Sequence, residues 1–210
     1  MTNSSDPLSL ALPPRGREHT GKLVLIIGPS GVGKSVIFKS LKKQHPEFHF
    51  PRSATTRARR KGESDAIYHF VNDQEFQKLR DEGAFLECAR IHNIAWYGTL
   101  LNEILPAIED GKTVVREVDV QGFDSIRKHE KFSGPSAPYR LQSIFILPEN
   151  REQLIARITH RAPISNDELQ RRIKSMDSEM TYAKLCDIQI LNKEGKLKES
   201  IRNVEEAILA

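Results

Sequence analysis

Short apolar runs separated by polar segments set the expected order of elements. Residues 23–27, Leu-Val-Leu-Ile-Ile, are continuously apolar, which is typical of a strand buried on both faces of a parallel sheet. Residues 28–33 contain three glycines and are expected to form a turn. Residues 35–44 have helical periodicity, which predicts a helix with Val36, Ile37 and Leu41 toward the core. The ordered part of the chain therefore begins with a strand, a glycine loop and a helix.

Further elements alternate in the same way along the rest of the chain. Apolar stretches predict strands at residues 85–90, 113–120, 141–147 and 187–191. Helical periodicity predicts helices at residues 73–83, 102–110, 125–131, 149–158, 166–183 and 197–209, with Asp73 as the N-cap of the first. Strands that alternate with helices predict an α/β fold, in which helices flank a mostly parallel core sheet.

Two segments stand outside this alternation. Residues 1–20 are rich in Ser and Pro and follow neither period, so we expect a flexible N-terminal tail. Residues 51–99 begin with basic side chains and continue with short strand-like stretches, which indicates an insert that forms a lobe of its own. The expected organisation is one domain at 21–210, with a core at 21–50 and 100–210 and a lobe at about 51–99.

Composition excludes several classes of protein without identifying a partner. The 210 residues are 38% hydrophobic and 29% charged, too apolar for a disordered chain and too polar for a membrane protein. The net charge of +4 only weakly indicates an anionic partner, and no nucleic-acid recognition motif accompanies it. Two cysteines, Cys88 and Cys186, make no disulfide framework and fit reduced thiols in the cytoplasm. We expect a cytoplasmic protein with neither a membrane nor a nucleic-acid partner.

The glycine loop carries the strongest chemical signal in the sequence. It fits the phosphate-loop pattern G-x-x-x-x-G-K-[ST] through Gly28, Pro29, Ser30, Gly31, Val32, Gly33, Lys34 and Ser35. Glycines let the backbone wrap closely around a phosphate, and the amide N–H groups point inward at the positive end of the following helix. Lys34 can reach the β- and γ-phosphates, and the Ser35 hydroxyl can bind Mg²⁺. The motif predicts a site for a nucleoside triphosphate with Mg²⁺.

Phosphate loops occur in motors, GTPases and small kinases, so this motif does not identify the class of protein and other features of the sequence have to distinguish them. A GTPase is expected to carry an Asn-Lys-x-Asp guanine motif, whereas residues 192–195 read Asn-Lys-Glu-Gly and lack the Asp. A motor is expected to be a larger chain. A small kinase is therefore favoured.

Several charged residues have types and spacings that suit nucleotide chemistry. Arg57 and Arg60 lie three residues apart, and guanidinium forks suit a phosphate dianion, although the same pattern fits a solvated basic surface. Glu87 lies in a mostly apolar run, where a lone charge is costly unless it has a partner or faces water at a sheet edge. Glu117 and Asp119 have the spacing that places both carboxylates on one face of a strand.

Six short segments in the order of one known family accompany the phosphate loop. They are Ser-Ala-Thr-Thr-Arg at 53–57, Arg-Lys-Gly-Glu at 60–63, Tyr-His-Phe at 68–70, Tyr-Gly-Thr at 97–99, Glu-Val-Asp-Val-Gln-Gly at 117–122 and Phe-Ile-Leu-Pro at 145–148. From about Lys22 to the C-terminus the chain thereby resembles the guanylate kinase family. The resemblance implies a core, a GMP-binding lobe and a mobile lid at about 157–172. It also implies transfer of the γ-phosphoryl group of ATP to GMP or dGMP.

The resemblance also implies a role for each matching residue. The GMP phosphate would be held by Arg57, Arg60, Tyr68 and Tyr97, and the guanine would be contacted by Ser53, Glu87, Thr99 and Glu117. Asp119 would lie near Mg²⁺ with Ser35, and Asn192 would lie beside the adenine of ATP. Arg157, Arg161 and Arg172 would reach the transferring phosphoryl group from the lid and its flank, beside the catalytic Lys34.

The chain departs from the family pattern at two places that bear on function. Residues 160–163 read His-Arg-Ala-Pro where the family usually has Gly-Arg-Gly, which would stiffen the lid around Arg161. Arg116 adds a charge where neutral residues are common. Two other functions therefore stay open: a related kinase that acts on a ribose phosphate, and a non-catalytic guanylate-kinase-like interaction module. The intact Lys34 and Ser35 argue against the second, because a scaffold has no need of a phosphate loop.

Overall fold

A four-stranded parallel sheet forms the core of the protein. The computed structural model describes residues 21–91, 94–161 and 165–210, and the predicted tail at 1–20 lies outside them. The strands lie in the order β6 (Thr113–Glu117), β1 (Lys22–Ile27), β7 (Arg140–Pro148) and β8 (Ile188–Asn192), and each neighbouring pair is parallel. The α/β fold with a parallel core sheet is thus confirmed.

Strand β1 is buried on both faces of the core sheet. Its side chains alternate between the faces, so Val24 and Ile26 pack on one side and Leu23, Leu25 and Ile27 on the other, all with zero exposure. Burying each such side chain contributes about 1.5–3 kcal/mol. Because both faces are covered, the strand is apolar at every position from 23 to 27.

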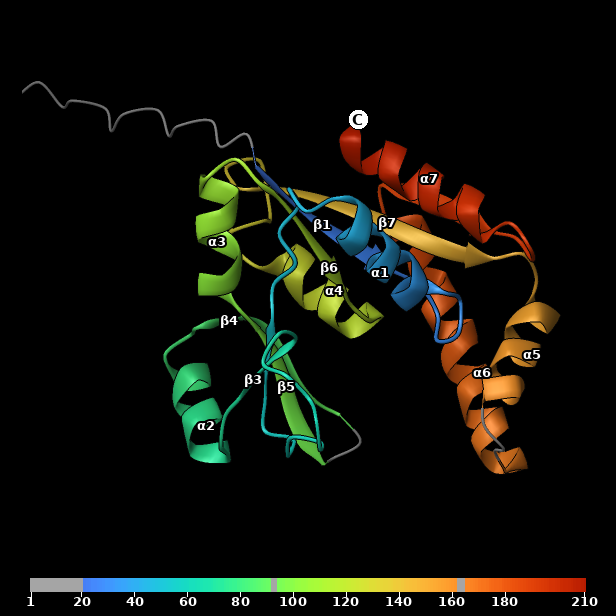
Figure 1. The fold of residues 1–210 in the computed structure, drawn as a ribbon, viewed down its shortest axis with the longest axis horizontal. Helices are drawn as coiled ribbons and strands as arrows, with labels where there is room; N and C mark the ends of the chain where they lie inside the picture. The colour runs from blue at the N-terminus through green and yellow to red at the C-terminus, as the bar shows by residue number, and fades with distance from the viewer. Residues whose placement is uncertain (1–20, 92–93, 162–164) are drawn as a thin grey trace, which may run out of the picture.

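Helices on each side supply the cover for these two faces. α1 (Lys34–Gln44) and α7 (Leu197–Leu209) pack on the first face, and α3 (Leu101–Glu109) and α4 (Val120–Lys128) pack on the second (Figure 1). In α1, Ile37 is fully buried as expected, but Val36 is 51% exposed, so its prediction as a core residue was wrong.

A second sheet is formed by residues 53–100. Its strands lie in the order β3 (Tyr68–Phe70), β2 (Ser53–Thr55), β5 (Ala95–Leu100) and β4 (Phe85–Ile91). β2 pairs parallel with β3, and β5 pairs antiparallel with both β2 and β4. β5 was not predicted as a strand, because its pattern is short and mixed; it follows closely after β4, whereas its other partner, β2, lies far earlier in the sequence.

Helix α2 (Asp73–Asp81) gives the second sheet its own small core. Phe76 is almost fully buried, and its ring stacks on that of Phe85 with 4.5 Å between the centroids. The N-cap is Asn72 and not the predicted Asp73: the Asn72 side chain accepts a hydrogen bond from the Glu75 backbone N–H in a capping box.

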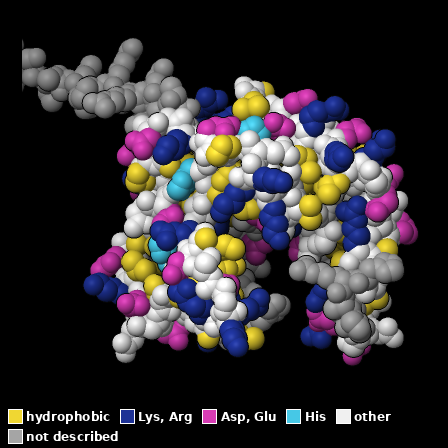
Figure 2. All heavy atoms as spheres, viewed as in Figure 1, with side chains coloured by type: hydrophobic (Ala, Val, Ile, Leu, Met, Phe, Trp, Pro, Cys, Tyr) yellow, Lys and Arg dark blue, Asp and Glu magenta, His cyan; other side chains and the backbone are white. Residues whose placement is uncertain are grey.

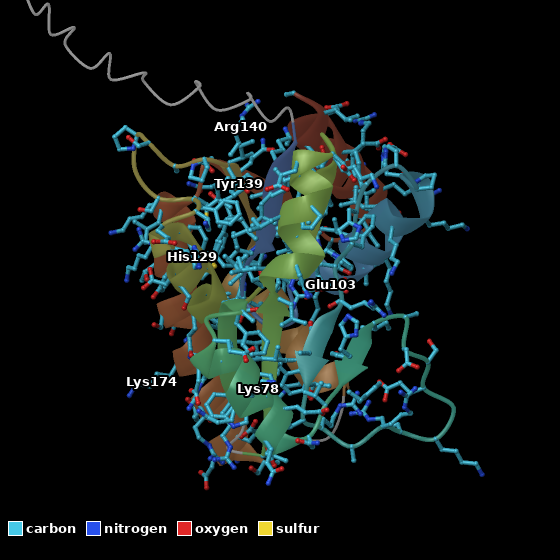
Figure 3. All side chains as sticks on the ribbon, turned by 90° about the vertical axis from the view of Figure 1, so that its left-hand side faces the viewer. Lys78, Glu103, His129, Tyr139, Arg140 and Lys174 are labelled. Carbon is cyan, nitrogen blue, oxygen red and sulfur yellow. The ribbon has the colours of Figure 1, made fainter. Side chains whose placement is uncertain are left out.

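Glu103 connects the first turn of α3 to the second sheet. Its carboxylate accepts hydrogen bonds from the Arg52 guanidinium at 2.9 Å, from the Arg52 backbone N–H at 3.2 Å and from His69 Nε2 at 2.7 Å. Figure 3 shows Glu103 at the end of α3 that faces this sheet. One side chain thereby joins the core and residues 53–100.

Helices α5 (Arg151–Arg161) and α6 (Asn166–Met180) form a separate arm (Figure 1). The predicted helix at 166–183 ends at 180 and continues as the 3₁₀ helix η1 (Thr181–Leu185). Figure 2 shows a deep hollow between this arm and the part that contains the second sheet and α2. Within the three described ranges, no helix is both long enough and apolar enough to cross a membrane.

The segment after β6 differs from the sequence prediction. A strand was expected at 113–120 and a helix at 125–131, but β6 ends at Glu117 and α4 already begins at Val120. The cause is Asp119, whose side chain caps α4 by accepting a hydrogen bond from the Gly122 backbone N–H at 2.8 Å. Glu117 and Asp119 therefore do not lie on one strand face, as their spacing had suggested.

Candidate active site

One cavity of about 650 Å³ lies at the carboxyl end of the core sheet and extends to the second sheet. That location is typical of ligand sites in open α/β sheets. Predicted site residues in its lining are Gly28, Ser30, Lys34, Ser35, Ser53, Tyr68, Glu87, Tyr97, Glu117 and Asp119. The lining also includes residues that the sequence had not indicated as site residues, namely Phe38, Ile67, Ala89, Arg116, Val118, Gly122 and Glu179.

The phosphate loop holds a backbone shape that requires glycine. Gly28 has a φ of +148° and Gly33 a φ of +108°, both in the region that disfavours a side chain. A Cβ on Gly33 would lie 2.7 Å from Asn192 Nδ2. Asn192 is buried and donates to the Val32 carbonyl at 2.7 Å, while its own oxygen accepts from Ser200 at 2.9 Å. Asn192 thus links the phosphate loop to Ser200 on α7 and holds the loop in place.

Lys34 is the first residue of α1, and its ammonium contacts the loop and faces several carboxylates. Its ammonium donates to the carbonyls of Gly28 at 2.5 Å and Pro29 at 3.1 Å. Burial lowers the pKa of Lys34 below its usual range, and the nearby charges of Glu117, Glu179 and Asp119 oppose that shift. The loop backbone and the lysine together offer a concentrated positive site within the cavity.

Side-chain oxygen atoms that could bind a metal ion lie close together beside the phosphate loop. The Ser35 hydroxyl donates to Glu117 Oε1 at 3.0 Å, and Asp119 lines the same cavity while it caps α4. Mg²⁺ favours oxygen ligands and is usually held by one or two carboxylates together with substrate phosphates. One hydroxyl and two carboxylates therefore fit the predicted metal site at Ser35 and Asp119, with Glu117 as an additional oxygen ligand.

Glu179 on α6 is the residue of this region that sequence reasoning missed most clearly. Its Oε2 accepts a hydrogen bond from the Ser30 backbone N–H at 3.1 Å, and its Oε1 accepts from the Ser175 hydroxyl at 2.8 Å. A carboxylate on an amide of the phosphate loop shows that this N–H points toward an anion. No local signal marked Glu179, because α6 is rich in charged residues throughout.

Glu87 lies at the opposite end of the cavity and is enclosed by polar partners. Its Oε1 accepts a hydrogen bond from the Thr99 hydroxyl at 2.5 Å, and its side chain is 13% exposed. Burial raises the pKa of Glu87, whereas the Thr99 hydrogen bond and the charge of Arg116 act to lower it. Thr99 itself is fully buried behind Glu87. The sequence had left two possibilities for this carboxylate, a partner or water at a sheet edge; β4 is an edge strand, and Thr99 provides a partner.

Arg57 and two tyrosines lie beside this end of the cavity. The rings of Tyr68 and Tyr97 meet edge to face at 6.0 Å between centroids, and the Arg57 guanidinium lies 5.3 Å from the Tyr68 ring. Glu63 holds Arg57 through two hydrogen bonds of 2.7 and 3.0 Å and accepts a third from the Arg60 backbone N–H. This local fold fixes the direction of the Arg57 fork.

The three arginines predicted for the lid have different surroundings. Arg157 donates to the Val32 carbonyl of the phosphate loop at 3.2 Å and to Glu194 at 2.9 Å, so it already lies at the loop. Arg172 donates to Glu168 on its own helix at 2.9 Å. Arg161 ends α5, but its side chain and residues 162–164 lie outside the described part of the structure.

The chain is similar to known proteins in sequence and in fold. The family model for guanylate kinase matches residues 20–210. The guanylate kinase of Trichormus variabilis is 38% identical over 190 residues, which cover 90% of this chain and 90% of that protein. The guanylate kinase of Campylobacter jejuni is 37% identical over 192 residues, which cover 90% of this chain and 89% of that protein.

A solved structure of guanylate kinase from Anaplasma phagocytophilum has the same fold. It superposes with a TM-score of 0.64 at 22% identity and covers 92% of this chain and 87% of that chain. At that identity the likeness supports the fold alone, whereas the family model and the relatives above 30% identity support membership. The chain belongs to the guanylate kinase family.

Proposed function

We propose that this chain is an ATP-dependent guanylate kinase, which transfers the γ-phosphoryl group of ATP to GMP or dGMP and releases ADP with GDP or dGDP. The observation that carries the proposal is the single cavity: the phosphate loop with Lys34 lies at one end and the Glu87 carboxylate at the other. A cavity of about 650 Å³ lies within the usual range of about 300–1,000 Å³ for small-molecule sites. Two nucleotides bound from opposite ends would bring their phosphates together in the middle.

The end with Glu87 binds the acceptor nucleotide. Glu87 accepts hydrogen bonds from N1–H and the 2-amino group of guanine, with Ser53, Thr99 and Glu117 completing the base contacts. Adenine has an acceptor at N1 and no 2-amino group, so the carboxylate rejects it. Arg57, Arg60, Tyr68 and Tyr97 hold the GMP phosphate, with Glu63 keeping the Arg57 fork in place.

The end with the phosphate loop binds ATP. Residues 28–35 surround its phosphates, Lys34 neutralises charge on the β- and γ-phosphates, and Asn192 acts through the loop that it supports. Glu179 leaves the Ser30 amide as the phosphates take its place. Ser35 and Asp119 would hold Mg²⁺, which would supply further charge neutralisation on the phosphates.

Transfer itself needs alignment and charge neutralisation more than acid–base chemistry. The attacking oxygen of GMP is already anionic at neutral pH, so the mechanism uses no general base. Lys34 and the arginines Arg157, Arg161 and Arg172 stabilise the charge that develops on the transferred phosphoryl group. The segment at about 157–172 acts as the lid, and its closure over the cavity excludes water and suppresses hydrolysis of ATP.

The proposal places the reaction in the cytoplasm. Both cysteines in the described structure, Cys88 and Cys186, are free thiols, which fits a reducing compartment.

An acceptor panel with Mg-ATP tests the proposal: GMP, dGMP, AMP, UMP and a ribose bisphosphate. We expect ADP and GDP in equal amounts with GMP, a similar rate with dGMP, and little turnover of AMP. Activity only with the ribose bisphosphate would indicate the alternative kinase. A protein that turns over none of these acceptors, and whose thermal stability does not change with Mg-ATP and GMP, would be a non-catalytic module. Lys34→Met should lose at least about 10³-fold in kcat, whereas Lys39→Met, an exposed lysine of the same helix, should not.

A further inference from the structure

Arg116 is a buried cation in the wall of the cavity with an incomplete set of partners. It lies on β6 in the core sheet, but its guanidinium reaches the second sheet, where Nη2 lies 2.6 Å from Ser53 Oγ. Nη1 is 3.4 Å from the Pro51 carbonyl, and Nη2 is 3.9 Å from Glu87 Oε1. Within the described residues, its fully buried Nε has no hydrogen-bond partner. An arginine at this position therefore needs a reason beyond packing.

The contact with Ser53 fixes the direction of a hydroxyl hydrogen. A guanidinium has only donors, so the Ser53 oxygen must accept the hydrogen bond from Arg116. The single hydrogen of Ser53 must then point away from Arg116. Because Ser53 lines the cavity, its hydroxyl is available there as a donor. Without the guanidinium the hydroxyl could rotate and offer a donor or an acceptor equally well.

The same guanidinium faces the Glu87 carboxylate. The Thr99 hydroxyl donates to Oε1, the atom that also lies nearest to Arg116. Both partners favour the ionised carboxylate, which accepts hydrogen bonds and donates none. Arg116 is thus placed to set two polarities at once: an acceptor at Glu87 and a donor at Ser53.

We propose that Arg116 is a positioning residue that determines specificity at the end of the cavity where the phosphoryl-accepting nucleotide binds. By orienting Ser53 and Glu87, Arg116 makes this end select a 6-oxopurine base. This inference rests on the proposed function of the cavity. The Ser53 hydroxyl donates to the oxo group and Glu87 accepts from the adjacent N1–H, a pairing that guanine and hypoxanthine share. Adenine presents an amino donor and a ring acceptor at the same two positions, so both contacts are mismatched.

The test compares GMP, IMP and AMP as acceptors for the full chain and for Arg116→Met. We expect kcat/KM for GMP and for IMP to fall about 10- to 100-fold with that for AMP nearly unchanged, so the GMP-to-AMP ratio falls by at least about tenfold. Arg202→Met removes a positive charge from the exposed face of α7 and should leave all three values unchanged. An unchanged GMP-to-AMP ratio in Arg116→Met would overturn the inference.

A pH profile separates the positioning role from a merely structural one. The groups that face Glu87 are Arg116 from β6, Thr99 from β5 and Asp119 at the start of α4. Removing the Arg116 charge should move the acidic limb of kcat/KM for GMP to higher pH by about 1 pH unit. Arg116→Lys keeps the charge and should keep the limb in place. An acidic limb that is identical in the wild type and Arg116→Met would contradict the role assigned to Arg116.

Two further measurements keep the outcomes distinct. Thermal unfolding with and without Mg-ATP shows whether Arg116→Met folds, because only a folded variant is stabilised by the nucleotide. If Arg116→Met does not fold, Ser53→Ala provides the same comparison. Ser53→Ala should lower the GMP-to-AMP ratio of kcat/KM without moving the acidic limb. An unchanged ratio in Ser53→Ala would then overturn the inference. If the wild type phosphorylates no GMP, the proposed function fails. If the wild type is active on GMP but the ratios do not change, only the inference about Arg116 fails.

Discussion

Glu103 joins the core to the second sheet, and its ionisation should contribute measurably to stability. Burial by itself raises the pKa of Glu103, but hydrogen bonds from His69 and Arg52 lower it to about 2, from an ordinary value of 4.5. Replacing Glu103 by Gln removes the charge while it keeps the shape of the side chain. The two donors, His69 on β3 and Arg52 just before β2, then lose an ionised acceptor.

The shift in pKa sets the size and the direction of the effect. A decrease from 4.5 to about 2 corresponds to about 3.4 kcal/mol of stability, since each pKa unit is worth about 1.36 kcal/mol. Solvent reaches part of the cluster and screens it, which reduces the expected contribution to about 1.5–2 kcal/mol. Because the folded-state pKa is lowered, this stability is present above about pH 4.5 and is lost as the pH falls through about 2.

Urea unfolding of the wild type and Glu103→Gln at pH 7, 5, 4 and 3 measures this contribution. We expect the variant to be less stable by about 1.5–2 kcal/mol at pH 7, with the difference at pH 3 less than about half of that. Glu206→Gln, on the exposed face of α7, is a control that should change little at any pH. A difference for Glu103→Gln that is absent at pH 7, or independent of pH from 7 to 3, would refute the reasoning.

Three further variants test other parts of the structure. Phe76→Ala should reduce the free energy of unfolding by about 3–5 kcal/mol in denaturant titrations, because it empties the core beneath α2. His45 lies between Glu47 and Glu205; burial lowers its pKa, but their hydrogen bonds raise it overall. Its contribution should therefore be present at low pH and lost as pH rises through that raised pKa, so His45→Gln should be more destabilising at pH 6 than at pH 9 in thermal unfolding. Gly33→Ala should weaken Mg-ATP binding at least tenfold in calorimetry, about 1.4 kcal/mol, because a side chain at φ +108° distorts the phosphate loop.

Local patterns in the sequence predicted the centre of the fold. The apolar run at 23–27 indicated a strand covered on both faces, and β1 is that strand. The helix after the phosphate loop was also predicted, although it begins one residue earlier, at Lys34. Such elements are predictable because their signal lies within a few neighbouring residues.

Elements that depend on distant partners were harder to predict. β5 lies between β4, which ends just before it in the chain, and β2, which lies far earlier; the pairing with β2, which makes β5 an inner strand, cannot be seen in Ala-Trp-Tyr-Gly-Thr-Leu itself. The predicted end of β6, at residue 120, was wrong because the hydrophobic alternation through Val118 and Val120 outweighed the capping signal of Asp119. Asp is a favoured N-cap residue, so Asp119 could have marked the start of α4.

The candidate site shows the same division. The phosphate loop could be found from its spacing alone, and Glu87 from the cost of a charge in an apolar run. Glu179 could not, because its role depends on α6 packing beside a loop that lies 149 positions earlier in the chain. Arg116 was noticed as a charge where the family usually has a neutral residue, but only the fold shows that it reaches Ser53 and the cavity.

Transfer of a labelled phosphoryl group tests the central claim most directly. The protein is incubated with GMP, Mg²⁺ and ATP that carries the label in its γ-phosphorus, and the nucleotides are then separated. The account predicts that all label lost from ATP appears in the β-phosphoryl group of GDP, and that Lys34→Met abolishes this transfer. Label that is released as inorganic phosphate, or that stays in ATP with the folded wild type, would contradict the claim that one cavity joins the two nucleotides for reaction.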